Sequence, residues 1–174
     1  VPAGGGDADR RLRRAGRRAR RGRDRRRDRQ RPRAALGGGG PELLDVLARY
    51  GSPLGRAFQY RDDVLGVFGE PEVTGKPAGD DLREGKPTLP LIHVMQRGTA
   101  AQANSVRRAI ENGGRDDFPA VLEAIRATGA LDHTLRQAAI EADLAIKSIQ
   151  MLLPASQYKD SLLELPAFAV ARSY

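Results

Sequence analysis

Apolar residues recur at steps of three and four from about residue 41 onward, and this spacing constrains the fold more than any other feature. Leu43, Leu47, Leu54, Phe58 and Leu65 fall on one face of a helix. No segment alternates apolar and polar residues as a half-buried strand does, and no internal repeat is visible. The pattern predicts an all-α fold for residues 41–174.

Glycine and proline residues divide this region into separate helices. Gly51 to Pro53 predict a break between a short helix that begins at Pro41 and a longer one over residues 53–68. Residues 70–81 contain two prolines and two glycines and are expected to form a loop. Further helices are predicted over residues 82–96, 100–111, 117–128, 135–152 and 159–172.

The first 36 residues form a separate, arginine-rich region. Residues 1–33 hold fifteen arginines and four aspartates, whereas the whole chain has a net charge of +8. With almost no apolar residues, this tail is expected to be disordered. Three interpretations stay open: an arm that neutralises nucleic-acid phosphates, a solvated tail without a partner, or a GC-rich segment translated in the wrong frame, since it has arginine but no lysine.

The composition bears on the cellular location and on the kinds of site that the chain can hold. The 174 residues include no cysteine, so disulfides and thiolate metal sites are excluded. No apolar run approaches the roughly 20 residues that a transmembrane helix needs. There is no apolar segment of a secretory signal at the N-terminus. We expect a cytoplasmic protein without a membrane span, made of one domain and a tail.

Two adjacent carboxylates, Asp62 and Asp63, interrupt a helical apolar segment. A buried carboxylate without a partner is costly, so the pair either faces water or meets a cation. The loop and helix that follow bring the first lysines of the chain, Lys76 and Lys86, each directly after a glycine. Carboxylates can hold Mg²⁺, Mg²⁺ binds phosphate oxygens, and ammonium groups neutralise the remaining charge. The alternatives are a solvated surface pair and a site for Mg²⁺ with a polyphosphate.

Residues 51–90 contain a motif that consists of Phe58-Gln59, Asp62-Asp63, Gly75-Lys76, Asp81 and Gly85-Lys86. With this motif, the segment resembles the second aspartate-rich region of the trans-type isoprenyl (polyprenyl) diphosphate synthases, most closely the bacterial geranylgeranyl or farnesyl diphosphate synthase type. The segment after Gly129 is similar to the C-terminal helices of that family. The resemblance implies the C-terminal part of the isoprenoid synthase helical fold over residues 41–174.

The resemblance also implies a prenyltransferase of isoprenoid biosynthesis that condenses isopentenyl diphosphate with an allylic diphosphate in a Mg²⁺-dependent reaction. Asp62 would bind Mg²⁺, with Asp63 supporting it directly or through water. The resemblance also implies that the intact protein forms a homodimer, as members of the family do. Phe58, Gln59 and Lys76 would be catalytic. The substrate-binding residues would be Gln59, Arg61, Lys76 and Lys86.

Two departures from the family pattern qualify this expectation. Gly66 stands where the family often has a third carboxylate, one turn after Asp62. The first aspartate-rich motif is not found, so we expect a truncated chain with impaired activity. The alternatives are a non-catalytic helical partner of a full-length synthase and, third, a nucleic-acid-binding protein acting through its tail. His93 and His133 are interpreted as ordinary helix residues.

Overall fold

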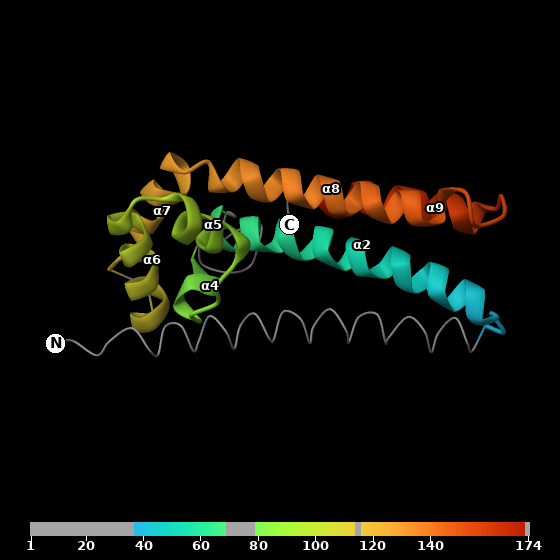
Figure 1. Ribbon diagram of the computed structural model, residues 1–174, viewed down its shortest axis with the longest axis horizontal. Coiled ribbons are helices and arrows are strands. Elements are labelled where there is room, and N and C mark those ends of the chain that lie inside the picture. The colour runs from blue at the N-terminus through green and yellow to red at the C-terminus, as the bar shows by residue number, and fades with distance from the viewer. Residues whose placement is uncertain (1–36, 69–78, 114–115, 173–174) are drawn as a thin grey trace. The chain divides into compact units, whose positions relative to one another are not determined.

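The computed structural model describes residues 37–68, 79–113 and 116–172, and within these ranges it contains helices and no strands (Figure 1). This confirms the predicted all-α class. The arginine-rich region at residues 1–36 and the loop residues 69–78 lie outside the described ranges. The helices are α2 (Pro41–Phe68), α4 (Asp80–Arg83), α5 (Leu89–Arg97), α6 (Ala100–Asn112), α7 (Phe118–Ala127), α8 (Ala130–Gln150) and α9 (Gln157–Ala171).

The described residues form two compact units. The α4–α7 unit consists of the described residues between 62 and 135, and the α9 unit consists of residues 37–61 and 136–172. Helices α2 and α8 each contribute one part to each unit. None of the helices in the described ranges is both long and apolar enough to cross a membrane.

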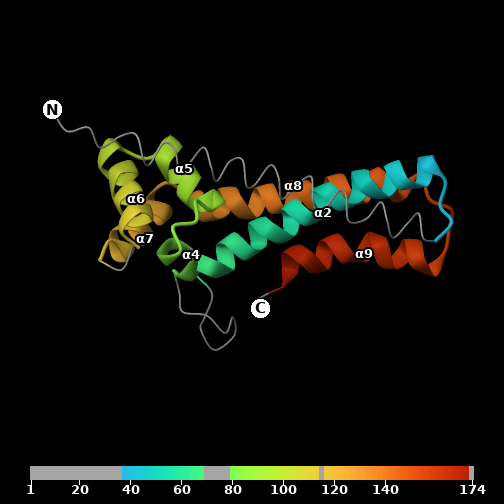
Figure 2. The same cartoon turned by 90° about the horizontal axis from the view of Figure 1, so that it is seen from below.

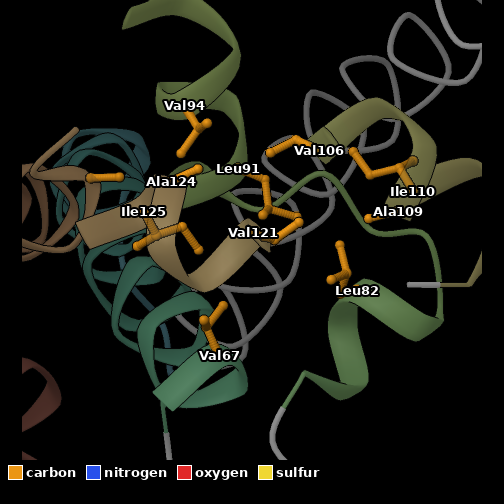
Figure 3. Close-up of a cluster of buried hydrophobic side chains, with 11 residues drawn as sticks. Val67, Leu82, Leu91, Val94, Val106, Ala109, Ile110, Val121, Ala124 and Ile125 are labelled. Atoms are coloured by element: carbon orange, nitrogen blue, oxygen red, sulfur yellow. The ribbon is translucent and has the colours of Figure 1, made fainter. Parts of the chain in front are cut away.

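The α4–α7 unit has a core built from successive short helices (Figure 3). Leu91 and Val94 of α5 are one turn apart, and both are buried. Helix α6 begins with a capping box, in which Thr99 and Gln102 each satisfy a backbone N–H of the first turn. The buried cluster comprises Val67, Leu82, Leu91, Val94, Val106, Ala109, Ile110, Val121, Ala124, Ile125 and Ala130.

The α9 unit brings together helices from both ends of the described chain, and α9 lies alongside α2 and runs in the same direction (Figure 2). Its buried cluster contains Tyr50 of α2 with Ala145 and Ile149 of α8. The Tyr50 hydroxyl donates a hydrogen bond of 2.7 Å to the Leu162 carbonyl of α9. The small side chain of Ala145 on this face of α8 is fully buried.

The predicted break at Gly51 to Pro53 is wrong, because α2 continues through Pro53 to Phe68. A proline inside a helix removes one backbone hydrogen bond and costs about 3 kcal/mol. Here Pro53 is buried, and so are Tyr50 and Ala57 of the same helix. Burial of this face stabilises the continuous helix more than the proline destabilises it. The predicted end of the helix at Phe68 is confirmed.

The helix predicted over residues 82–96 is also wrong, since two helices occupy this region. Helix α4 ends at Arg83 and α5 begins at Leu89. Between them Gly85 has a φ of +64°, which favours glycine, and Pro87 cannot donate a helical hydrogen bond.

The remaining boundaries agree with the sequence prediction more closely. The helix predicted over residues 135–152 begins five residues earlier, at Ala130, and ends at Gln150, and Leu152 is exposed. Helices α6, α7 and α9 confirm the predicted helices over residues 100–111, 117–128 and 159–172 to within two residues. Gly129 follows α7 with a φ of +64°, as expected for a C-terminal glycine.

Candidate functional site

The predicted site residues are distributed over the two units. Phe58, Gln59 and Arg61 belong to the α9 unit, whereas Asp62, Asp63 and Lys86 belong to the α4–α7 unit. The residues from 58 to 63 are consecutive on α2. Lys76 lies outside the described residues, so its predicted role stays a prediction.

Asp63 is buried and contacts the start of α5. Its side-chain Oδ2 accepts a hydrogen bond of 2.9 Å from the backbone N–H of Leu89, the first residue of α5. The first N–H groups of a helix have no partner within the helix, and a carboxylate near them is favourable. Thr88 at the N-cap makes no capping hydrogen bond with its side chain. Asp63 therefore supplies a capping acceptor for α5.

Asp62 differs from Asp63 in its burial. It is half-buried, whereas Asp63 is only 7% exposed. Successive residues of a helix point about 100° apart, so the two carboxylates leave α2 in different directions. The family resemblance assigned both aspartates to Mg²⁺, but in the structure their side chains differ in solvent exposure.

Gly66 lies directly beneath the carboxyl group of Asp81. A Cβ atom at Gly66 would lie 2.5 Å from Oδ2 of Asp81, which is too short for a real contact, and 3.1 Å from Cγ, which is tight. The Gly79 N–H also donates a hydrogen bond of 3.0 Å to the Gly66 carbonyl. A side chain at position 66 would therefore displace Asp81. Gly66 therefore allows the close approach of the Asp81 carboxyl group to α2.

Lys86 is held in the turn between α4 and α5. Its Nζ lies 2.8 Å from Oδ1 of Asp81 and 2.5 Å from Oε2 of Glu84. The hydrogen bonds to Asp81 and then to Glu84 raise the pKa of Lys86 above its ordinary value. The Lys86 backbone N–H donates to the Asp81 carbonyl at 2.9 Å. Lys86 is thus a fixed, half-exposed cation, which is suitable for binding a phosphate group.

Phe58 and Arg61 contact Arg172 at the end of α9, a residue that the sequence did not single out. The guanidinium carbon of Arg172 lies 3.6 Å from the centroid of the Phe58 ring, a cation–π contact. Arg61 donates a hydrogen bond of 2.7 Å from Nε to the Arg172 carbonyl. Because these residues are more than 100 positions apart, no local pattern could have identified the contact.

Arg56 forms a second unpredicted contact within the α9 unit. Its Nε and a terminal nitrogen bind the two carboxylate oxygens of Glu141 at 2.5 and 2.6 Å. Arg56 also donates to the Ser52 hydroxyl at 2.9 Å. Such a two-point pair fixes the α2 side chain against α8 with defined geometry.

The two histidines of the chain stack on each other. The ring centroids of His93 and His133 are 4.3 Å apart, and His93 Nε2 lies 3.3 Å from the Thr128 carbonyl. Within the described ranges, no group of three or more His, Cys, Asp or Glu residues is arranged to hold a metal ion.

Besides Asp63, the described motif residues with carboxylate oxygens are Asp62 and Asp81, and Oδ1 of Asp81 also bonds to Lys86. Hard oxygen ligands suit Mg²⁺, which keeps waters and uses one or two carboxylates together with substrate phosphates. The donor chemistry fits Mg²⁺ bound with a diphosphate. A metal held by many protein ligands does not fit the residues that the structure describes.

Comparison with known proteins identifies relatives over most of the chain. The polyprenyl synthetase family model matches residues 32–126. The octaprenyl diphosphate synthase of Escherichia coli (strain K12) is 47% identical over 138 residues, which cover 79% of this chain and 42% of that protein. The chain therefore spans less than half the length of this curated relative.

Solved structures match to a similar extent. A polyprenyl synthase from Caulobacter crescentus, complexed with calcium and isoprenyl diphosphate, is 41% identical with a TM-score of 0.72, over 81% of this chain and 43% of that one. A geranylgeranyl pyrophosphate synthase from Corynebacterium glutamicum, complexed with isoprenyl diphosphate and magnesium, is 36% identical with a TM-score of 0.71. That match covers 80% of this chain and 40% of the solved one.

Proposed function

The chain belongs to the polyprenyl synthetase family, and from this premise we propose that it carries the second aspartate-rich half of a trans-prenyltransferase site. The reaction is the condensation of isopentenyl diphosphate with an allylic diphosphate, which lengthens the prenyl chain. The proposal draws on the motif from Phe58 to Lys86 and on the ligands of the solved relatives, which include isoprenyl diphosphate and magnesium.

The observation that supports this function most is the fixed position of Lys86. Asp81 and Glu84 hold its ammonium group in the turn that follows α4. A diphosphate carries several negative charges, and preorganised cations stabilise the leaving pyrophosphate as the allylic C–O bond breaks. Lys86 binds phosphate oxygens in this scheme, and Lys76 provides a second ammonium group, as the sequence predicted.

The other motif residues have roles that complement the lysines. Mg²⁺, when bound, supplies positive charge that neutralises the diphosphate oxygens. Asp62 would hold this ion, and the sequence assigns Asp63 to it as well. Gln59 directs its amide oxygen toward the positive charge that develops on the allylic carbon. Phe58 offers a ring face to the same charge, while Arg172 covers the ring on one side.

Calorimetry with inorganic pyrophosphate and with an allylic diphosphate tests this function. The full chain is expected to bind both ligands only in the presence of Mg²⁺. The Lys86→Ala variant removes a charge-assisted contact, so its affinity should fall on the order of tenfold. The double variant Asp62→Ala/Lys76→Ala should abolish binding. Lys147→Ala is a matched control, because Lys147 makes only a surface ion pair with Asp143.

Two results would contradict the proposal. One is unchanged affinity in the Asp62→Ala/Lys76→Ala variant, which would remove these residues from the site. The other is an equal loss of affinity in the Lys86→Ala and Lys147→Ala variants, which would indicate a general effect of surface charge.

A non-catalytic helical partner of a full-length synthase is the second candidate function. The observation that favours it is the set of large apolar side chains that the α9 unit exposes, among them Leu165 and Phe168. Size-exclusion chromatography with a full-length relative separates the two functions. A stable complex without Mg²⁺-dependent pyrophosphate binding by the chain itself would favour the partner role.

A further inference from the structure

Three contacts attach the segment 79–89 to the last two turns of α2. The Gly79 N–H donates to the Gly66 carbonyl at 3.0 Å. The carboxyl group of Asp81 packs onto Gly66, where a Cβ atom would overlap it. The Leu89 N–H donates to Oδ2 of Asp63 at 2.9 Å. We call these three contacts the α2 seam.

Asp63 and Gly66 are three residues apart, so they lie on the same face of α2. This is the face on which the turn containing Lys86 is attached. The Lys86 backbone N–H in turn bonds to the Asp81 carbonyl, and its ammonium group bonds to the Asp81 carboxylate. The segment that contains Lys86 therefore contacts α2 both before Lys86, at Gly79 and Asp81, and after it, at Leu89. The position of Lys86 depends on these contacts.

The burial of Asp63 is consistent with a structural role. A carboxylate that is only 7% exposed needs strong partners, and a helix N-terminus provides N–H donors and a favourable dipole. Thr88 occupies the N-cap position, but its buried Oγ1 makes no hydrogen bond in the part of the chain that the structure describes. An N-cap threonine usually accepts from the second or third residue of the helix, whereas Asp63 accepts from the N–H of the first residue, Leu89, and so caps α5 from outside the helix.

We infer that Asp63 is a positioning residue and not a Mg²⁺ ligand: its carboxylate attaches the N-terminus of α5 to α2 and thereby holds Lys86 in place. Asp62 is then the α2 carboxylate that binds the metal ion. The phosphate-binding role of Lys86 rests on the proposed function, whereas the α2 seam does not depend on it.

Substitutions by asparagine separate the two roles. Asparagine keeps an oxygen that accepts the Leu89 N–H, but it lacks the negative charge of a good Mg²⁺ ligand. Asp63→Asn should retain the Mg²⁺-dependent affinity for inorganic pyrophosphate to within about threefold, because a neutral acceptor still makes the hydrogen bond. Asp62→Asn should lower this affinity on the order of tenfold or more, since a charged ligand is lost. Asp132→Asn is the control, an exposed carboxylate in the first turn of α8.

Amide hydrogen exchange provides a readout that does not involve a ligand. In Asp63→Ala the Leu89 N–H loses its acceptor, so its exchange should accelerate on the order of tenfold or more. Asp63→Asn should restore most of the protection. Gly66→Ala provides an independent test of the α2 seam, because its Cβ displaces Asp81 and should accelerate exchange at the Lys86 N–H.

The outcomes separate this inference from the proposed function. An equal loss of pyrophosphate affinity in Asp62→Asn and Asp63→Asn would overturn the inference and identify Asp63 as a ligand. Unchanged Leu89 exchange in Asp63→Ala would overturn it as well. If the unmodified chain binds no pyrophosphate with Mg²⁺, the proposed function fails, and the exchange measurements still decide whether Asp63 positions α5.

Discussion

The α4–α7 unit and the α9 unit differ in how completely they bury their apolar side chains. The α4–α7 unit encloses a cluster that includes Leu91, Val106 and Ile125, each at most 1% exposed. In the described ranges, the exposed large hydrophobic side chains all belong to the α9 unit. They are Leu43, Phe58, Ile140, Leu144, Met151, Leu152, Tyr158, Leu165 and Phe168.

The difference follows from how each unit is assembled. The α4–α7 core is built from short helices that follow one another in the sequence. Their apolar faces therefore pack against helices that are near in the chain. The α9 unit joins segments from opposite ends of the described chain, with a small buried cluster and the polar contacts Tyr50–Leu162 and Arg56–Glu141. We therefore expect apolar packing to dominate the stability of the α4–α7 unit. Polar contacts should contribute a larger share of the stability of the α9 unit.

The largest expected effect comes from a cavity in the α4–α7 core. Ile125 is fully buried, so Ile125→Ala should lower the free energy of unfolding by about 2–5 kcal/mol. Ile140→Ala in the α9 unit is the matched control. Because Ile140 is 51% exposed, its substitution should change stability by less than about 0.5 kcal/mol. Denaturant unfolding measures both, and similar losses in the two variants would contradict the comparison.

The second prediction concerns the pH dependence of the α9 unit. Burial raises the pKa of Tyr50 from 10.0 to about 12. Because the folded pKa lies above the unfolded pKa, the stabilisation is complete below pH 10 and is lost as the pH rises toward 12. The loss should reach roughly 2–3 kcal/mol. Amide exchange in α9 as a function of pH, corrected for the intrinsic exchange rate, measures it.

Two variants control for general alkaline effects on the α9 unit. Tyr50→Phe should remove this part of the pH dependence, because phenylalanine does not titrate. Tyr158→Phe should leave it unchanged, since Tyr158 is 74% exposed. The same alkaline loss in Tyr50→Phe as in the unmodified chain would contradict the assignment to Tyr50.

The third prediction separates a buried ion pair from a surface pair in the α9 unit. The side chains of Arg56 and Glu141 are 25% and 14% exposed, so Arg56→Ala leaves a largely buried carboxylate unpaired. The expected loss is about 2 kcal/mol, below the range for fully buried pairs. Lys147→Ala breaks the exposed pair with Asp143 and should cost less than about 0.5 kcal/mol. Equal melting temperatures for the two variants would show that the Arg56 pair contributes little.

The smallest predicted effect compares two N-cap threonines of the α4–α7 unit. Thr88→Val removes a buried hydroxyl that has no hydrogen bond among the described residues, so stability should rise by up to about 1 kcal/mol. Thr99→Val removes the acceptor of the Gln102 N–H and should cost about 1 kcal/mol. Thermal unfolding distinguishes the opposite signs, and a loss in both variants would assign Thr88 a polar partner.

The sequence by itself determined the helical class and the ends of α2 and α7. These features depend on residues within about four positions of each other, because helical periodicity, caps and breaks are local. The proline-containing stretch of α2 was predicted incorrectly for the same reason. Its continuity depends on the burial of Tyr50 and Ala57, which a local pattern does not reveal.

Only the tertiary structure decided which contacts the motif residues make. Asp62 and Asp63 are equivalent in the sequence, yet Asp63 caps a helix 26 residues away. Gly66 stands where the family often has a third carboxylate, and in the structure the carboxyl group of Asp81 packs against it. Arg172 contacts Phe58, which lies 114 positions earlier in the sequence. Such contacts depend on which helix faces pack together, and the hydrophobic effect that drives packing is non-directional, so a local pattern does not specify the polar partners that packing brings together.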